Sequence, residues 1–169
     1  MGGANIGVEH VEAISENEAH RGVIRERGHG PQVYFITHNK PGERRKKANK
    51  LLKEIEKNDA GNGWVGDLVE KEWAGAMSHF LQQKINVVRK EGFERFDEDW
   101  LLIYDNWSLP SFEIEYAAQV FQDLITTSGG LREFKRIFIM SGKNFCEVSR
   151  KGVRLLAVHD LWKRANQDA

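Results

Sequence analysis

The chain has 169 residues, of which 40% are hydrophobic, and its 25 Lys and Arg residues balance its 25 Asp and Glu residues. A chain of this length and apolar content forms one domain with a substantial core, which excludes a disordered protein. The zero net charge lacks the strong basic excess of a dedicated nucleic-acid binder, although it allows a local basic face. We therefore expect a single domain over residues 1–169.

The composition also bears on the compartment and on membrane contact. The only cysteine is Cys146, so an internal disulfide is excluded and a reducing environment is favoured. No apolar run approaches the roughly 20 residues that a membrane-spanning helix needs. The segment at the start is too short and too polar for a secretory signal. These features predict a soluble cytoplasmic protein that does not contact a membrane.

The hydrophobic pattern alternates between strand-like and helix-like segments along the chain. Apolar, β-branched or alternating runs predict strands at residues 6–14, 32–37, 100–104, 136–140 and 153–158. Apolar residues at helical spacing, or capping signals, predict helices at residues 16–27, 43–57, 67–90 and 112–125, and a last helix after residue 158. Residues 141–144, followed by a short strand at residues 145–148, predict a hairpin. This order predicts an α/β fold, with a layered mixed sheet of four to six strands that is flanked by helices and has an antiparallel edge.

Acidic residues and a histidine interrupt the first predicted strand. In an extended chain Glu9 shares its side with Gly7 and Val11, whereas His10 and Glu12 face the other way. We expect the side of Glu9 to be the more buried one, and a buried carboxylate must be paired, protonated or bound to a metal. Glu9, His10 and Glu12 are therefore candidate metal ligands. The alternative, an edge strand with surface charges, stays open.

The six basic residues within residues 44–53 are candidates for binding the phosphates of a nucleic acid. They are Arg44, Arg45, Lys46, Lys47, Lys50 and Lys53. On the predicted helix Lys46, Lys50 and Lys53 share a face opposite the leucines. The alternative is an ordinary solvated helix face whose charge is balanced by nearby glutamates.

Two further patterns have both a functional and an ordinary interpretation. Asp105 follows the predicted strand at residues 100–104, and ligands in open α/β sheets bind outside the carboxyl ends of strands. Asp and Asn are also common turn formers. Residues 61–66 match the G-x-G-x-x-G fingerprint, but they follow a predicted helix and not the strand that dinucleotide binding requires. We interpret them as a loop between two helices.

Several segments together resemble a known superfamily. Residues 6–9 read I-G-V-E, residues 101–106 read L-L-I-Y-D-N, and residues 137–142 read I-F-I-M-S-G. This pattern resembles the PD-(D/E)XK restriction-endonuclease-like superfamily, and the similarity extends over most of the chain. The resemblance implies a restriction-endonuclease-like fold and a metal-dependent phosphodiesterase (nuclease) with Glu9 as a catalytic, metal-binding residue. In such a site Mg²⁺ polarises the phosphodiester and activates the attacking water.

Two positions depart from the three-residue site of that superfamily. The lysine expected two residues after Glu9 is Val11, and the aspartate of a preceding hairpin strand has no counterpart in this sequence. A single carboxylate is a poor Mg²⁺ site unless substrate phosphate and water complete the octahedron. We therefore expect an N-terminally incomplete or degenerate relative with weak or absent cleavage. Glu16, Glu18 or His20 could replace a lost ligand.

Two other function classes stay open. A non-enzymatic α/β module that binds another protein would suit the five tryptophans, and the neutral charge and Val11 favour it over a nuclease. A Toprim-like phosphotransfer fold would use Glu9 and Asp105, but it requires a second acid two residues later, where Trp107 stands. The expected partner is thus nucleic acid or another protein.

Overall fold

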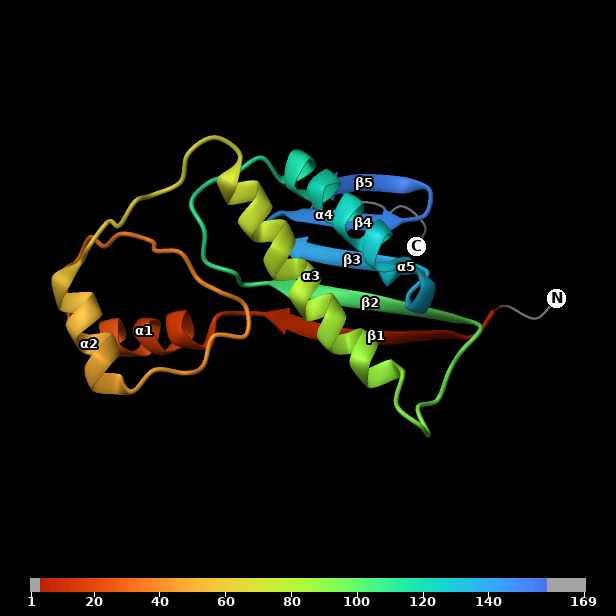
Figure 1. Ribbon diagram of the computed structural model, residues 1–169, viewed down its shortest axis with the longest axis horizontal. Helices are drawn as coiled ribbons and strands as arrows, with labels where there is room; N and C mark the ends of the chain where they lie inside the picture. The colour runs from red at the N-terminus through yellow and green to blue at the C-terminus, as the bar shows by residue number, and fades with distance from the viewer. Residues whose placement is uncertain (1–3, 158–169) are drawn as a thin grey trace, which may run out of the picture.

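The computed structural model describes residues 4–157 (Figure 1). Its five strands form one sheet in the order of the chain. They are β1 (Ile6–Ala13), β2 (Glu98–Asp105), β3 (Arg136–Ser141), β4 (Asn144–Ser149) and β5 (Gly152–Ala157). The first three strands are parallel, and β4 and β5 are antiparallel to their neighbours. The predicted α/β fold with a mixed sheet and an antiparallel edge is confirmed.

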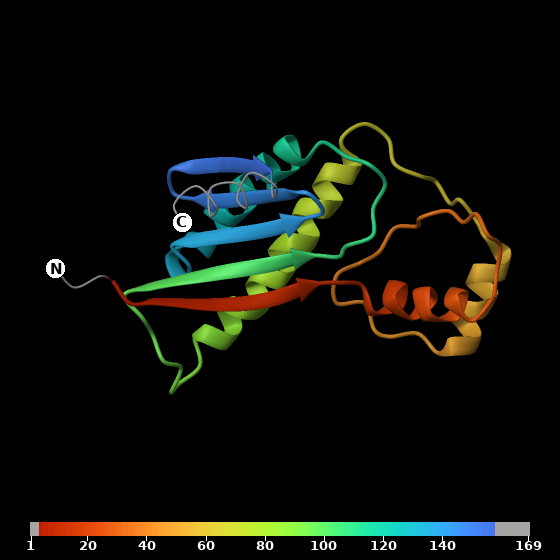
Figure 2. The same ribbon diagram turned by 180° about the vertical axis from the view of Figure 1, so that it is seen from behind.

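The two long helices cover one face of this sheet. The helices are α1 (Glu16–Glu26), α2 (Ala48–Lys57), α3 (Leu68–Val88), α4 (Ile114–Ser128) and α5 (Gly130–Glu133). Figures 1 and 2 show from opposite sides that α3 and α4 cross the same face. They lie in the long connections that parallel strand neighbours require. In both views α1 and α2 lie beyond the carboxyl end of β1.

The main core fills the space between α3, α4 and the sheet. Leu101 of β2, Ile139 of β3 and Trp73 of α3 are fully buried there. Alternate residues of a strand point to the same face of the sheet, so the neighbours of each buried core residue point to the face away from α3 and α4. The α1–α2 unit has a small cluster of its own, formed by Ile24, Leu51 and Ile55.

The prediction of a strand at residues 32–37 is wrong, because this segment is a loop outside the sheet. The N–H of Phe35 donates to Oδ1 of Asn58 at 3.1 Å, and the carbonyl of Val33 accepts from Nδ2 of Asn58 at 3.2 Å. The side chain of Asn58 thus forms hydrogen bonds with backbone groups that would pair with a neighbouring strand in a sheet. Val33 is 81% exposed and Phe35 is 53% exposed. Strand propensity reflects packing on a half-buried sheet surface, which this segment does not have.

The helix predicted at residues 43–57 begins later, at Ala48. Lys47 has an extended backbone, and the N–H of Lys46 donates to Oδ1 of Asn17 at 2.8 Å. The chain before Ala48 is therefore held against α1 and does not continue the helix backwards. The other predicted helices before residue 130 and the predicted hairpin are present with shifted ends, and residues 61–66 belong to a loop between α2 and α3. The helix predicted after residue 158 lies outside the described residues.

Candidate functional site

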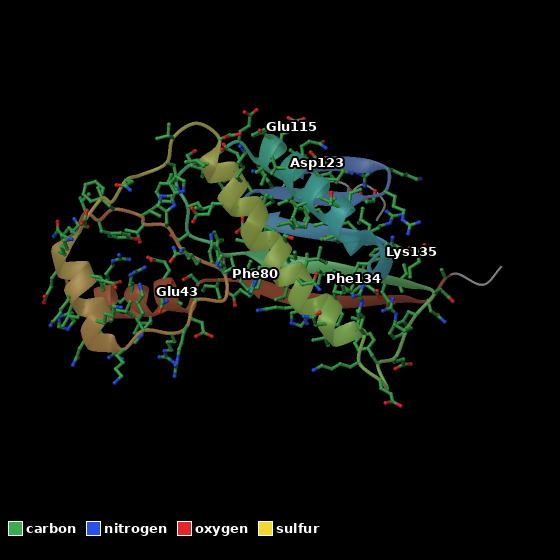
Figure 3. All side chains as sticks on the ribbon, in the orientation of Figure 1. Glu43, Phe80, Glu115, Asp123, Phe134 and Lys135 are labelled. Atoms are coloured by element: carbon green, nitrogen blue, oxygen red, sulfur yellow. The ribbon has the colours of Figure 1, made fainter. Side chains whose placement is uncertain are left out.

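A cleft of about 540 Å³ lies at the carboxyl end of β1. Four parts of the chain line it, namely the end of β1 with the start of α1, the α1–α2 loop, one face of α3, and Trp107 just after β2. Its polar lining residues are Glu12, Ser15, Glu16, Lys40, Glu43, Arg44, Arg45, His79 and Gln83. Figure 3 labels Glu43 on the loop and Phe80 on α3, which line the cleft from two elements. This is the end of the sheet at which open α/β folds bind their ligands.

Two buried amide side chains hold the α1–α2 loop beside the cleft. Asn17 is 1% exposed, and its Oδ1 accepts the N–H of Lys46 at 2.8 Å. Asn39 is 3% exposed, its Oδ1 accepts the hydroxyl of Ser15 at 3.1 Å, and its N–H donates to Oε1 of Glu72 at 3.2 Å. Buried polar groups are stable only when they are hydrogen-bonded, so these contacts fix both ends of residues 39–46.

Gly42 brings the middle of this loop close to α3. Its φ is +72°, and a Cβ at this position would stand 3.0 Å from Cε1 of His79. Any other residue would strain the backbone and displace the His79 ring. The contact therefore sets the width of the cleft between the loop and α3.

The charges of the cleft are mixed, and most of its cations are exposed. Lys40, Arg44 and Arg45 are exposed, and no ion pair joins them to another side chain within residues 4–157. Glu43, by contrast, pairs with Lys46 at 3.4 Å. These three cations therefore lie in the same cleft as the carboxylates of Glu12 and Glu16.

The first strand divides the predicted metal ligands between two faces of the sheet. Glu9 is on the side of α3, where Nζ of Lys84 donates to its Oε2 at 3.0 Å. His10 and Glu12 are on the other side, where they line a hollow of about 390 Å³, and Glu12, near the carboxyl end of the strand, also borders the cleft. Oε1 of Glu12 accepts Nδ2 of Asn106 at 2.6 Å. The structure therefore brings His10 and Glu12 to one surface and does not bring Glu9 to it.

Two carboxylates of the cleft are the candidates for metal binding at this end of the sheet. Within residues 4–157 no group of three or more His, Cys, Asp or Glu side chains could together hold a metal ion. Glu12 and Glu16 are two carboxylates of one cleft, which Mg²⁺ accepts when substrate phosphate and water complete its octahedron. Glu9 as a ligand remains a prediction, and binding there requires that the Lys84 ammonium move away.

Asp105 lies at the end of β2, as the sequence predicts, but its carboxylate is used within the protein. Its Oδ2 accepts the indole N–H of Trp73 at 2.7 Å, and its Oδ1 accepts the backbone N–H of Trp107 at 3.0 Å. Trp73 is fully buried. The contacts of Asp105 therefore connect the end of β2 to the core helix α3.

The six predicted phosphate-binding residues fall into separate places. Arg44 and Arg45 line the cleft. Lys46 is part-buried and contacts Glu54 at 3.3 Å as well as Glu43. Lys47, Lys50 and Lys53 are exposed and do not line the cleft. Arg44 and Arg45 in the cleft are thus separate from the lysines at the start of α2 and on the surface of that helix.

The residues suggested as replacement ligands on α1 also separate. Glu16 lines the cleft. Glu18 accepts hydrogen bonds from Arg21 at 2.9 Å and from Arg25 at 2.8 Å, so its oxygens are already used. His20 is part-buried, and its Nδ1 has no hydrogen-bond partner within the described residues.

Sequence reasoning missed the residues that position the cleft. Asn17, Asn39, His79 and Gln83 carry no local signal, because isolated amides and histidines occur equally in loops and on helix surfaces. Gln83 Nε2 lies 3.0 Å from Nε2 of His79, so these two helix residues form one polar unit in the cleft wall. Gly42 follows Pro41, which marks a turn but does not indicate its contact with α3.

Comparison of the chain with protein-family models, with curated proteins and with solved structures found no match. Among residues 4–157, no helix combines the length and the apolar character that crossing a membrane requires.

Proposed function

We propose that this domain binds nucleic acid through the sugar–phosphate backbone in the cleft at the carboxyl end of β1, as a relative of the restriction-endonuclease-like, Mg²⁺-dependent nucleases. The observation that carries the proposal is the position of Lys40, Arg44 and Arg45 in the same cleft as Glu12 and Glu16. Exposed cations that neutralise phosphates release condensed counterions, and this release drives sequence-independent binding.

The loop geometry supports binding of a large anion. Residues 39–46 are anchored by Asn17 and Asn39, so the backbone that carries the cations is ordered before a ligand arrives. Preorganised groups lose less conformational freedom on binding. Lys40, Arg44 and Arg45 remain exposed beyond this anchored backbone, where phosphates can reach them.

Weak cleavage or none is part of the proposal. Mg²⁺ in the cleft would be held by Glu12 and Glu16 together with substrate phosphate, and it would polarise the phosphodiester. Val11 stands at the position of the superfamily's lysine and packs against the core. A valine can neither orient water nor stabilise developing charge, so the chemical step lacks that contribution.

The test compares two pairs of basic residues that carry the same charge. Arg44→Ala/Arg45→Ala removes two cleft cations, and Lys50→Ala/Lys53→Ala removes two exposed cations of α2. Binding of a fluorescent duplex would be followed by anisotropy at several salt concentrations. Each lost phosphate contact lowers the slope of log K against log salt by about 0.9. We expect the cleft variant to lose about 1.8 from that slope and the α2 variant to stay near the parent.

Equal losses in the two variants would contradict the proposal, because they would show that only total charge matters. Binding that both variants leave unchanged would contradict it as well. Circular dichroism of each variant checks that the fold is intact, which is expected since all four side chains are exposed.

A further inference from the structure

A second cleft, of about 790 Å³, lies at the opposite end of the sheet. Six basic residues line it, namely Arg132, Lys135, Arg136, Arg150, Lys151 and Arg154. Two acidic residues, Glu98 and Glu147, also line it. Arg136 begins β3. The two clefts are therefore separated by about the length of a strand, roughly 20 Å at 3.3 Å per residue.

Ion pairs within the protein neutralise only some of the six basic residues of this cleft. Glu147 is 7% exposed, and its two oxygens accept from Arg136 at 3.0 Å and from Arg154 at 2.5 Å. Lys135 contacts Glu98 at 3.5 Å. The remaining cations, Arg132, Arg150 and Lys151, form no ion pair within residues 4–157, and all three are exposed. Nη2 of Arg150 donates to the carbonyl of Leu131 at 3.4 Å, a contact that does not neutralise its charge. The cleft thus has three cations available to an anionic ligand.

A row of aromatic rings begins at this cleft and crosses the sheet. The rings of Trp100 on β2 and Phe138 on β3 have centroids 5.4 Å apart, and those of Phe138 and Phe145 on β4 are also 5.4 Å apart. The guanidinium of Arg136 lies 5.1 Å from the centroid of the Trp100 ring. The row is on the sheet face that is turned away from α3 and α4, the face seen in Figure 2.

We propose that this cleft and the adjacent ring of Trp100 form a binding site for single-stranded nucleic acid. Arg132, Arg150 and Lys151 contact successive phosphates, and a base stacks beside Arg136 on Trp100. A positive groove next to aromatic side chains is the combination that binds single strands without sequence preference, because every base has a π face. The bases of a duplex are already stacked on one another and cannot reach Trp100. This site is separate from the cleft at the carboxyl end of β1 and does not depend on the function proposed for that cleft.

The experiment measures binding of fluorescent oligothymidylate of about 12 nucleotides, a length within the usual site size for single strands. The same oligonucleotide annealed to oligoadenylate is the duplex probe. Trp100→Leu is expected to weaken single-strand binding about 5- to 150-fold, the range measured for one stacked base, and to leave duplex binding unchanged. Arg150→Ala/Lys151→Ala is expected to reduce the salt slope for the single strand by about 1.4, or 0.7 for each phosphate.

A matched control removes two exposed lysines outside both clefts, Lys90→Ala/Lys143→Ala, and is expected to change neither affinity nor slope. Thermal unfolding shows whether Trp100→Leu folds. If it does not, Arg132→Ala with Arg150→Ala/Lys151→Ala decides the question, because these side chains are exposed.

Three results would overturn the proposal. The first is absence of single-strand binding by the parent chain. The second is a loss of single-strand binding that does not depend on this cleft. It would be seen as an equal loss in Lys90→Ala/Lys143→Ala, or as a loss in Arg44→Ala/Arg45→Ala alone, which would assign the binding to the other cleft. The third is a change in sedimentation of Trp100→Leu with unchanged oligonucleotide binding, which would show that the aromatic row joins two copies of the chain. Failure here leaves the duplex measurements on Arg44 and Arg45 unaffected.

Discussion

Nζ of Lys84 on α3 lies 3.0 Å from Oε2 of Glu9 on β1, although 75 residues separate them in the chain. The side chains are 21% and 32% exposed, so the pair is partly shielded from water. It connects the second half of α3 to the first strand of the sheet. It also places the Lys84 ammonium on the Glu9 carboxylate, which the sequence indicates as a metal ligand. This charge-assisted hydrogen bond occupies a lone pair of Glu9 that a metal would need.

Replacing Lys84 with Met should increase the affinity of Glu9 for a divalent cation. The parent must lose the ammonium contact before a metal binds, whereas Lys84→Met presents an unpaired carboxylate. Titration with Mn²⁺ and observation of paramagnetic broadening of β1 amide signals would measure the effect. Lys90→Met, an exposed lysine just beyond the same helix, is the control. Broadening elsewhere with the Glu9 signal unaffected would remove Glu9 as a ligand.

The chain alone should show no detectable nuclease turnover with Mg²⁺ or Mn²⁺. In the relationship proposed above, Val11 takes the place of a nuclease lysine, and loss of one charge-stabilising group costs about 3–4 kcal/mol in the transition state. Digestion of plasmid and single-stranded DNA is the measurement, with Glu9→Ala and Glu12→Gln beside the parent. Cleavage by the parent that disappears in either variant would restore the enzyme interpretation.

Replacing Asp105 should change stability and not nucleic-acid binding. Asp105→Ala leaves the buried indole N–H of Trp73 without its acceptor, which costs about 1–3 kcal/mol of unfolding free energy. Asp105→Asn retains an acceptor oxygen and is expected to lose less. Urea unfolding measures both variants. A loss of duplex binding in Asp105→Asn at unchanged stability would instead assign Asp105 to the binding site.

His38 should titrate above its ordinary range. A hydrogen bond to the carboxylate of Glu72 at 2.6 Å raises the pKa of His38, and a second one to the carbonyl of Gly63 at 2.8 Å adds to this effect. Only the protonated ring donates from both nitrogens. Because the folded pKa is the higher one, this contribution to stability is complete below the ordinary pKa of about 6.5 and is lost as pH rises through the folded pKa.

Nuclear magnetic resonance of the imidazole signals would test this pH dependence. Glu72→Gln removes the main cause, so the pKa of His38 in that variant should fall toward its ordinary value. Hydrogen exchange at Trp64 should become faster in the parent as pH passes the folded pKa, after correction for intrinsic exchange, because the ring of His38 lies 4.2 Å from that of Trp64. An unchanged pKa in Glu72→Gln would contradict the assignment.

The sequence by itself determined the class of fold and most of its elements. Apolar periodicity is a local property, so the three parallel strands, the long helix that buries Trp73 and the closing hairpin could be read from neighbouring residues. The sequence also indicated that basic residues and carboxylates are candidates for a site, since their types and spacing are local too. It could not show that Val33 and Phe35 lack a neighbouring strand, which depends on where the rest of the chain lies.

Only the tertiary structure decided which charged groups are available. Lys46 is paired within the protein while Arg44 and Arg45 line a cleft, and these residues are adjacent in the sequence. Glu9 and Lys84 meet across 75 residues, and Asn17 holds Lys46 across 29. Such contacts form when the packing of α3 on the sheet and of α1 beside the α1–α2 loop brings distant side chains within 3 Å or so of each other. No pattern within a few residues encodes that approach, because it is produced by the burial of the core as a whole.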